Sequence, residues 1–303
     1  MTPHHPTIPR RALALLVLLT VLWGTNWPLF PLAVREISVW TFRSVAVALA
    51  AVMLLAVARA RGQSLVIPRR HWGTVVAATL AYLVVWNIAS TYAAVLIPSG
   101  QAAILGFTMP LWAALIGWLF LRQGLSPRLA MALALGAAAV GLLMWRGLPA
   151  YAQAPAGFAL GLLAGIGWAV GTLILKRWPV EGVPATVLTG WQMLLAALPM
   201  ALGALLLGDG RLFMPSWTTV LVVGYIALVP MAIGNVAWFS IVGMLPASVA
   251  GLSSIMVPVV AMGAGAWLHN EPLGPLQWAA MACCAAAMWL AMAPARPGRR
   301  TTG

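Results

Sequence analysis

The residues that could carry out catalysis in this chain are few, and they lie outside its apolar segments. It has only four acidic residues, at segment ends or in connections: Glu36, Glu181, Asp209 and Glu271. No nucleophile–base arrangement, metal-ligand cluster or phosphate-binding glycine loop is recognisable by spacing. The adjacent Cys283 and Cys284 lack histidine or carboxylate neighbours, which favours buried packing residues over a metal site. We therefore expect no enzyme activity, no metal and no cofactor.

Tryptophans deep inside the apolar segments offer binding chemistry instead. A deep indole N–H needs a hydrogen-bond partner that lipid does not provide. Several of these tryptophans share a helical face with uncharged polar residues, at spacings of three or four. Such faces predict one substrate-binding lining, formed by Trp23, Asn26, Trp27, Tyr82, Trp86, Asn87, Gln101, Thr108, Trp112, Trp168, Thr172, Asn235, Trp238, Ser253 and Ser254.

The same side chains have a purely structural alternative, because amides and hydroxyls also bond one helix to another. Such interhelical bonds contribute roughly 0.6 to 2 kcal/mol each. Five segments that mix aromatic with neutral polar groups favour a shared lining over scattered packing contacts. The spacing of Gly157, Gly161 and Gly165 predicts something different, which is close packing of one helix against a neighbour.

The elements that would position these residues are membrane helices. Hydrophobic residues make up 63% of the chain and charged residues 7%, with a mean hydropathy of +0.97. This composition predicts an all-α polytopic membrane protein. With about 20 residues needed per crossing, we expect ten transmembrane helices, at 12–34, 38–58, 72–96, 99–121, 128–146, 156–176, 184–207, 217–240, 246–268 and 276–293.

The net charge of +13 sets topology rather than recruiting a polyanion. Most arginines and the sole lysine, Lys176, gather in alternate connections and in the tails. By the positive-inside rule, both termini are then cytoplasmic in a bacterial inner membrane. No basic stripe with interleaved aromatics is present, so we expect no nucleic-acid partner, only the lipid bilayer and a small-molecule substrate. The oligomeric state stays open.

An internal duplication organises the chain. Residues 97–127 align without a gap on residues 245–275, so that Pro110 meets Pro258 and, upstream, Asn87 meets Asn235. Each mid-segment proline removes a backbone donor, which predicts a helix break. We expect residues 1–148 to form one five-helix repeat and residues 149–303 a second one. Because five is odd, the second repeat lies inverted, as in alternating-access transporters.

The motifs resemble a known family. LWGTNWPLF at 22–30, TFRS at 41–44 and LFLRQGLSP at 119–127, with WAVGT at 168–172 and LHNEPLGP at 268–275, are similar to the EamA-type pattern of the drug/metabolite transporter superfamily. The resemblance is greatest to the YddG-type aromatic amino-acid exporters. It implies two inverted five-helix repeats, cytoplasmic termini and export of small metabolites. One departure is Gln123, where the family usually has a glutamate.

These observations favour an exporter of small amphipathic metabolites, above all aromatic or large apolar amino acids. The predicted lining carries no fixed charge, so it suits a zwitterion whose ring stacks while its polar ends bond to amides. No intramembrane acid is available for proton coupling. A drug or nucleobase exporter on the same fold is an alternative, and a membrane sensor or scaffold without transport is another.

Overall fold

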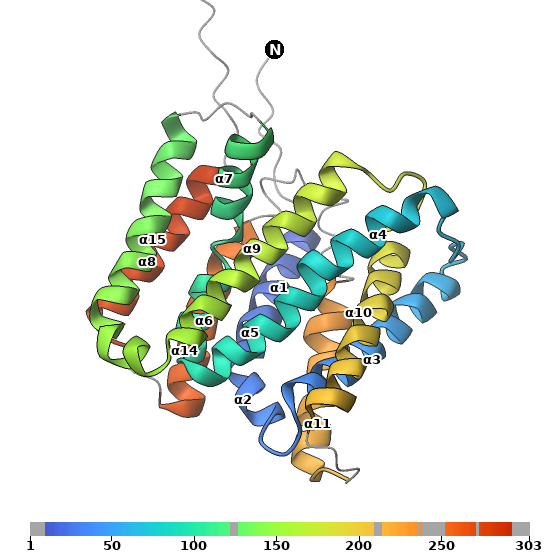
Figure 1. Ribbon diagram of the computed structural model, residues 1–303, viewed down its shortest axis with the longest axis horizontal. Helices are drawn as coiled ribbons and strands as arrows, with labels where there is room; N and C mark the ends of the chain where they lie inside the picture. The colour runs from blue at the N-terminus through green and yellow to red at the C-terminus, as the bar shows by residue number, and fades with distance from the viewer. Residues whose placement is uncertain are drawn as a thin grey trace, which may run out of the picture.

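The protein is an all-helical assembly in the part of the chain that the structure describes. A computed structural model describes residues 10–121, 127–208, 214–235, 237, 252–270 and 273–292 (Figure 1). In chain order the helices of the first half are α1 (Arg10–Asn26), η1 (Trp27–Leu29), α2 (Phe30–Ala33), α3 (Val39–Ala60), η2 (Arg69–His71), α4 (Trp72–Ala78), η3 (Thr79–Val84), α5 (Val85–Leu96), α6 (Ser99–Gly106), α7 (Met109–Leu121) and α8 (Pro127–Gln153). Those that follow are α9 (Pro155–Arg177), α10 (Ala185–Leu207), α11 (Trp217–Ile226), η4 (Ala227–Ile233), α14 (Leu252–His269) and α15 (Pro275–Met292).

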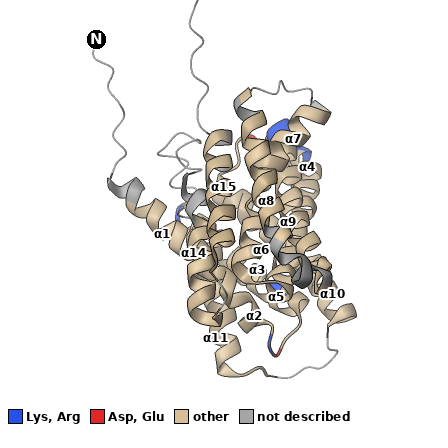
Figure 2. Ribbon diagram, turned by 90° about the vertical axis from the view of Figure 1, so that its left-hand side faces the viewer, with Lys and Arg blue, Asp and Glu red and all other residues tan. Residues whose placement is uncertain are grey.

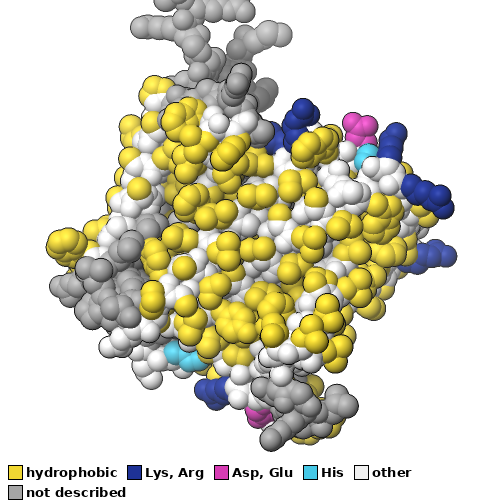
Figure 3. Space-filling view, viewed as in Figure 1, with side chains coloured by type: hydrophobic (Ala, Val, Ile, Leu, Met, Phe, Trp, Pro, Cys, Tyr) yellow, Lys and Arg dark blue, Asp and Glu magenta, His cyan; other side chains and the backbone are white. Residues whose placement is uncertain are grey.

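The surface of this bundle is that of a membrane protein. Within the described ranges, six helical stretches are long and apolar enough to cross a bilayer by length and composition. Large apolar side chains such as Leu205 and Trp267 are 80% and 85% exposed. Figure 3 shows a mostly hydrophobic face, and Figure 2 shows coloured charged residues of the described chain near helix ends. The expected helical membrane architecture is thus confirmed, while ten crossings and inverted repeats stay predictions.

The helix that contains Pro110 is interrupted. Helix α6 ends at Gly106 and α7 begins at Met109, with Phe107 and Thr108 in a turn between them. Proline near the first position of α7 suits this geometry, since its missing N–H is one that a helix start leaves unpaired anyway. The break predicted beside Pro110 therefore has a counterpart in the backbone.

The break predicted at Pro258 is wrong, because α14 continues through that residue. A proline inside a helix removes one backbone hydrogen bond, and membrane helices tolerate this where neighbouring helices and local adjustments compensate for the freed carbonyl. Helix α1 is such a neighbour: a Cβ built on Gly24 would lie 3.1 Å from the carbonyl oxygen of Val257. The two duplicated prolines thus stand in different local structures.

Two π-helical segments occupy equivalent positions of the duplicated sequence. The segment η3 begins at Thr79 and η4 begins at Ala227, the same 148-residue offset that relates Pro110 to Pro258. Such π segments are rare and are found mostly at functional sites. Each one lies in the middle of a longer helical run, between α4 and α5 or directly after α11.

Close helix packing brings these elements together around the centre. Helices α3 and α10 pack side by side, as do α8 and α15, and α9 packs on α5, α6 and α7 (Figure 1). Glycines of α9 permit its close packing on α6. Cβ atoms built on Gly161 and Gly165 would lie 2.8 Å from Leu105 and 3.0 Å from the Gly106 carbonyl oxygen. The packing role predicted for the glycine repeat is confirmed. Helix α8 also runs past residue 148 to Gln153, so the expected boundary between repeats falls inside it.

Candidate substrate cavity

A cavity of about 370 Å³ lies between the two halves of the described chain. Its walls come from α1, η1, α2 and α3, from η3 and α5, from the α6–α7 break, and from α9, α10 and η4. A volume of this size falls within the range of small-molecule sites. The rim residues Thr172 and Ala185 are exposed, whereas Trp27 and Phe30 are 3% and 2% exposed. The cavity therefore opens beside the 178–184 connection and is closed on the side of the 34–38 connection.

One wall of the cavity is a continuous aromatic cluster. Trp86 lies at its centre, with its ring centroid 4.8 Å from that of Trp168 and 5.9 Å from that of Trp27, both in tilted or edge-to-face arrangements. Tyr82 joins Trp168 at 5.3 Å, and Phe107 joins Trp86 at 6.0 Å. Edge-to-face pairs of this kind are stabilised by about 0.5–1.5 kcal/mol beyond their burial. The cluster thus fixes its own geometry while presenting ring surface to the cavity.

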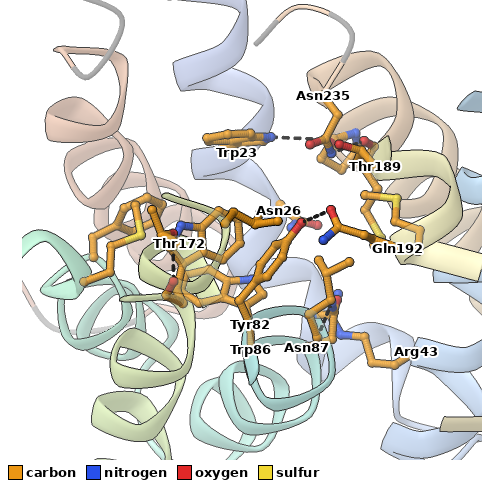
Figure 4. A pocket seen from close by; sticks show the side chains of 18 of the residues that line it. Trp23, Asn26, Arg43, Tyr82, Trp86, Asn87, Thr172, Thr189, Gln192 and Asn235 are labelled. Carbon is orange, nitrogen blue, oxygen red and sulfur yellow. Dashed lines mark hydrogen bonds between the residues drawn. The ribbon is translucent and has the colours of Figure 1, made fainter. Parts of the chain in front are cut away.

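The facing wall is polar. Figure 4 shows Asn235, Thr189 and Gln192 on one side of the cavity and Tyr82 and Trp86 on the other. The Tyr82 hydroxyl donates to Gln192 Oε1 at 2.7 Å and so ties η3 to α10 across it. Among the described atoms, Asn26 Oδ1 and Gln192 Nε2 are buried without a hydrogen-bond partner. One acceptor and one donor are therefore available to a ligand.

Two asparagines that closely follow the π segments, Asn87 in α5 and Asn235 after η4, form a matched pair of amides at the cavity. Asn87 Nδ2 donates to the Leu83 carbonyl at 2.8 Å, and Asn235 Nδ2 donates to the Met231 carbonyl. Both bonds reach back four residues, from duplicated positions. A π turn shifts the backbone hydrogen bonds from four to five residues apart, so a side-chain amide that bonds a nearby carbonyl compensates within the helix. The duplicated asparagines thus stabilise the π segments and also line the cavity.

The cavity contains a positive charge, which the predicted lining did not include, although the sequence indicates Arg43 as a buried arginine that could orient a carboxylate. Arg43 of α3 lines it and is 2% exposed, although the predicted lining carried no charged residue. The signal was its position inside an apolar segment, within the TFRS motif. Gln192 and Thr189 of α10 were missed as well, because the seventh predicted span was not assigned a lining face. Their spacing of three residues was the available signal.

Most of the predicted lining does meet at this cavity. The residues that line it are Trp23, Asn26, Trp27, Tyr82, Trp86, Asn87, Trp168, Thr172 and Asn235. Trp23 is anchored through its Nε1, which donates to the Pro230 carbonyl at 3.1 Å. Substrate contact by these residues stays a prediction.

Three predicted residues are placed elsewhere in the described structure. Gln101, Thr108 and Trp112 do not line the cavity. Thr108 is buried and donates to the Leu105 carbonyl, and Trp112 Nε1 donates to Thr108 Oγ1 at 3.1 Å. These bonds lie within the α6–α7 turn. The polar side chains of Thr108 and Trp112 therefore stabilise the helix break and do not line the cavity. Trp238 and the side chains of Ser253 and Ser254 lie outside the described residues.

The described side chains offer no group of three or more His, Cys, Asp or Glu residues that could hold a metal ion. Glu36 and Glu181 are both exposed in connections. The groups that a ligand would contact in the described cavity are therefore aromatic rings, amides, hydroxyls and one guanidinium.

Comparison with known proteins decides the family. The model of the EamA-like transporter family matches residues 10–145 and again residues 155–293. The chain belongs to the EamA-like transporter family. The drug/metabolite resemblance drawn from the motifs is confirmed, and transport across a membrane is the activity of the relatives by name.

Relatives of this EamA-like transporter cover most of its length at low identity. "Uncharacterized transporter YvbV" of Bacillus subtilis (strain 168) is 23% identical over 270 residues, which are 87% of this chain and 85% of the relative. "Uncharacterized inner membrane transporter YedA" of Escherichia coli (strain K12) is 26% identical over 265 residues, with 87% and 84% covered.

A third relative and one solved structure add to this. "Probable amino-acid metabolite efflux pump" of Salmonella typhimurium (strain LT2) is 26% identical over 202 residues, with 64% of this chain and 67% of the relative covered. A solved structure titled "Crystal structure of protein" has a TM-score of 0.66 at 21% identity, with 92% of this chain and 96% of that chain covered. That likeness extends to the fold alone.

Proposed function

We propose that this EamA-like transporter exports small amphipathic metabolites, above all aromatic or large apolar amino acids. The observation that carries the proposal is the two-sided cavity, with a Trp86-centred aromatic wall facing the amides of Gln192 and Asn235. A ring or long apolar side chain stacks on the first wall. The polar end of the same molecule bonds to the second.

The name of one relative points in the same direction. The Salmonella typhimurium protein is called a probable amino-acid metabolite efflux pump. Its aligned region extends over about two thirds of both chains, so a shared substrate class is a reasonable starting hypothesis. The cavity supplies the chemical reason. An aromatic amino acid has an apolar ring and a polar end, which match the two walls of this cavity of about 370 Å³.

The transport mechanism we propose is alternating access between the two halves of the chain. The family model matches each half once, and the π segments and paired asparagines recur at the duplicated offset. The cavity lies between elements of both halves. If the 178–184 connection is cytoplasmic, as the arginine and lysine distribution predicts, this conformation is open inward and closed outward.

The experiment that tests this function is substrate-dependent stabilisation of the purified protein across the twenty amino acids. A ligand that binds only the folded state raises the unfolding temperature by mass action. We expect the largest shifts from tryptophan, phenylalanine, tyrosine and leucine, and none from aspartate or lysine. Counterflow of labelled phenylalanine into protein-containing liposomes should follow the same ranking. Shifts from nucleobases or planar drugs, with none from amino acids, would overturn the amino-acid assignment.

A further inference from the structure

Arg43 is held in an unusual position for an arginine in a membrane helix. It lies near the start of α3 and is the only buried lysine or arginine among the described side chains. Its Nε donates to Thr91 Oγ1, which in turn donates to the Asn87 carbonyl at 2.7 Å. Its guanidinium carbon lies 4.1 Å from the ring centroid of Phe30 and 4.7 Å from that of Phe42. These contacts fix the direction of the side chain.

That direction leads to the cavity. Arg43 is a lining residue, and Figure 4 shows its side chain extending from α3 toward Asn87. Its Nη2 is buried without a hydrogen-bond partner among the described residues. The two acids that the structure describes, Glu36 and Glu181, are exposed in connections rather than near the cavity. The guanidinium thus has an oriented free donor and no described counter-charge.

Burying the Arg43 guanidinium has a desolvation cost that nearby groups must offset. Removing an ion from water costs several kcal/mol even after relaxation of the protein. Two flanking rings return part of this, since a cation–π contact is worth about 0.5–1 kcal/mol when exposed and about 2 or more when desolvated. A bound anion would supply the missing charge and use the free donor. Charge-assisted hydrogen bonds to carboxylates are roughly twice as strong as neutral ones.

We propose that Arg43 binds the carboxylate of the transported substrate. This rests on the proposed function and deepens it: the substrate must carry one acid group as well as an apolar body. The carboxylate accepts from Arg43 Nη2, the ring of the substrate packs on the Trp86 cluster, and Asn26 Oδ1 is free to accept from an ammonium group. A single guanidinium matches a single negative charge, which favours a monocarboxylate over a phosphate dianion.

Three small probes separate the contributions of acid and amine. L-phenylalanine carries both groups, 3-phenylpropanoate only the carboxylate and phenethylamine only the amine. In calorimetric titration of the full-length protein at pH 7, we expect phenethylamine to bind at least about tenfold more weakly than L-phenylalanine. The figure corresponds to the loss of one charge-assisted hydrogen bond of about 1.5–3 kcal/mol. We expect 3-phenylpropanoate to retain most of the affinity.

Variants assign that preference to Arg43. Arg43→Met should weaken L-phenylalanine and 3-phenylpropanoate at least about tenfold and leave phenethylamine equal or tighter, so that the preference for the acid disappears. Arg43→Lys keeps the charge and should retain part of it. The matched control is Arg35→Gln, which removes an exposed cation outside the cavity and should change no affinity.

The outcomes distinguish failure of this inference from failure of the function. If wild-type protein binds L-phenylalanine and phenethylamine equally, the Arg43 assignment is overturned and the amino-acid function stands. An Arg43→Met variant that weakens all three probes alike assigns Arg43 a structural role only. If chloride at equal ionic strength competes as well as 3-phenylpropanoate, the residue is an inorganic-anion site. If none of the probes binds wild-type protein, the proposed function fails and the inference falls with it.

Discussion

The side chains of the cavity combine ring-to-ring contacts with buried polar groups that have no partner among the described residues. Trp86, Trp168 and Tyr82 support one another edge to face. Arg43 and Gln192 carry buried donors without partners. The aromatic rings already contact one another, whereas the unpartnered donors of Arg43 and Gln192 would gain hydrogen bonds only from a ligand. The cavity would therefore select substrates that have both an apolar body for the rings and a hydrogen-bond acceptor for the free donors.

Replacing the central ring tests the aromatic half of this argument. We expect Trp86→Leu to weaken L-phenylalanine binding about two- to tenfold, because one aromatic pair is worth about 0.5–1.5 kcal/mol. Trp86→Phe should retain most of the affinity. Titration of both variants by calorimetry gives the comparison, with Trp145→Ala as a control because Trp145 is 77% exposed on α8. Equal losses in the Leu and Phe variants would mean that shape rather than stacking matters.

The success and failure of the residue predictions have a common physical cause. Helical spacing reveals which side chains share a face, so Trp23, Asn26 and Trp27 could be grouped from the sequence. It does not reveal which neighbour a face turns toward. Thr108 and Trp112 bond to each other beside the break in their own helix, and Gln192 of α10, to which no lining face was assigned, lies at the cavity. Arg43 was visible in the sequence, but its burial depends on Phe30 and Phe42 packing around it.

At the scale of elements, irregular helices shape the cavity. The α6–α7 break places Phe107 and Met109 at its wall, and the π segments place Tyr82 and Met231 there. The position of the first break follows from proline chemistry and was predictable. The π segments were not, because an extra residue per turn leaves no composition signal. Nor could the sequence tell that α14 continues through Pro258 while the equivalent helix breaks.

The different states of the two prolines give an element-scale prediction. Pro110→Ala restores a backbone donor beside the break and should let α6 and α7 join into a straighter helix. We expect slower transport of L-phenylalanine in liposomes with unchanged membrane insertion. Pro258→Ala should have a smaller effect, since α14 is already continuous. Equal rates for Pro110→Ala and wild type would show that the break plays no part in the transport cycle.

A second element-scale prediction concerns the closed end of the cavity. The Ser216 backbone N–H donates to Glu36 Oε2 at 2.7 Å, which joins the 34–38 connection to the start of α11. This bond, with help from the Ser216 side chain, lowers the pKa of Glu36 below its ordinary value of 4.5. A lowered carboxyl pKa stabilises the folded state above pH 4.5, and the stabilisation is lost as pH falls through the folded-state pKa.

Substituting Glu36 and lowering the pH should therefore both weaken the hydrogen bond between Glu36 and Ser216. We expect Glu36→Gln to lower the thermal unfolding midpoint at pH 7, by a small amount because the group is exposed. The difference from wild type should begin to shrink as pH falls below 4.5 and should vanish below the folded-state pKa, where wild-type Glu36 is neutral as well. Glu181→Gln is the control, since it removes an exposed acid from the 178–184 connection. A difference that stays constant from pH 7 to pH 3.5 would contradict the assignment.

At the scale of the whole molecule, the packing partners recur between the halves. Helix α1 packs on α14, and its counterpart in the predicted second repeat, α9, packs on α6 and α7. The pairs α3–α10 and α8–α15 each join counterparts directly. This pattern is what a two-fold relation between inverted repeats would produce, and it supports that prediction. The asparagines Asn87 and Asn235, which align in the duplicated sequence, also occupy matching structural positions after the two π segments, whereas the aligned prolines do not.

Energy coupling is a property of the whole molecule, and we expect passive transport without a proton. A proton-coupled carrier generally needs an ionisable group within the membrane that can load and release a proton. The chain has only four acids, and Glu36 and Glu181 lie exposed in connections, while Asp209 and Glu271 are outside the described residues. Arg43 is in the cavity, but an arginine does not release its proton under physiological conditions.

Liposomes containing the purified protein should therefore equilibrate or exchange L-phenylalanine without any ion gradient, and a cytoplasmic excess of substrate would set the direction of export. We expect an imposed pH gradient of one unit, in either direction, to leave the final internal concentration equal to the external one. Protein-free liposomes correct for leakage. Accumulation well above equilibrium that an uncoupler abolishes would show proton coupling, and Glu271→Gln would then be the first variant to measure, because Glu271 is the acid at the end of the ninth predicted span.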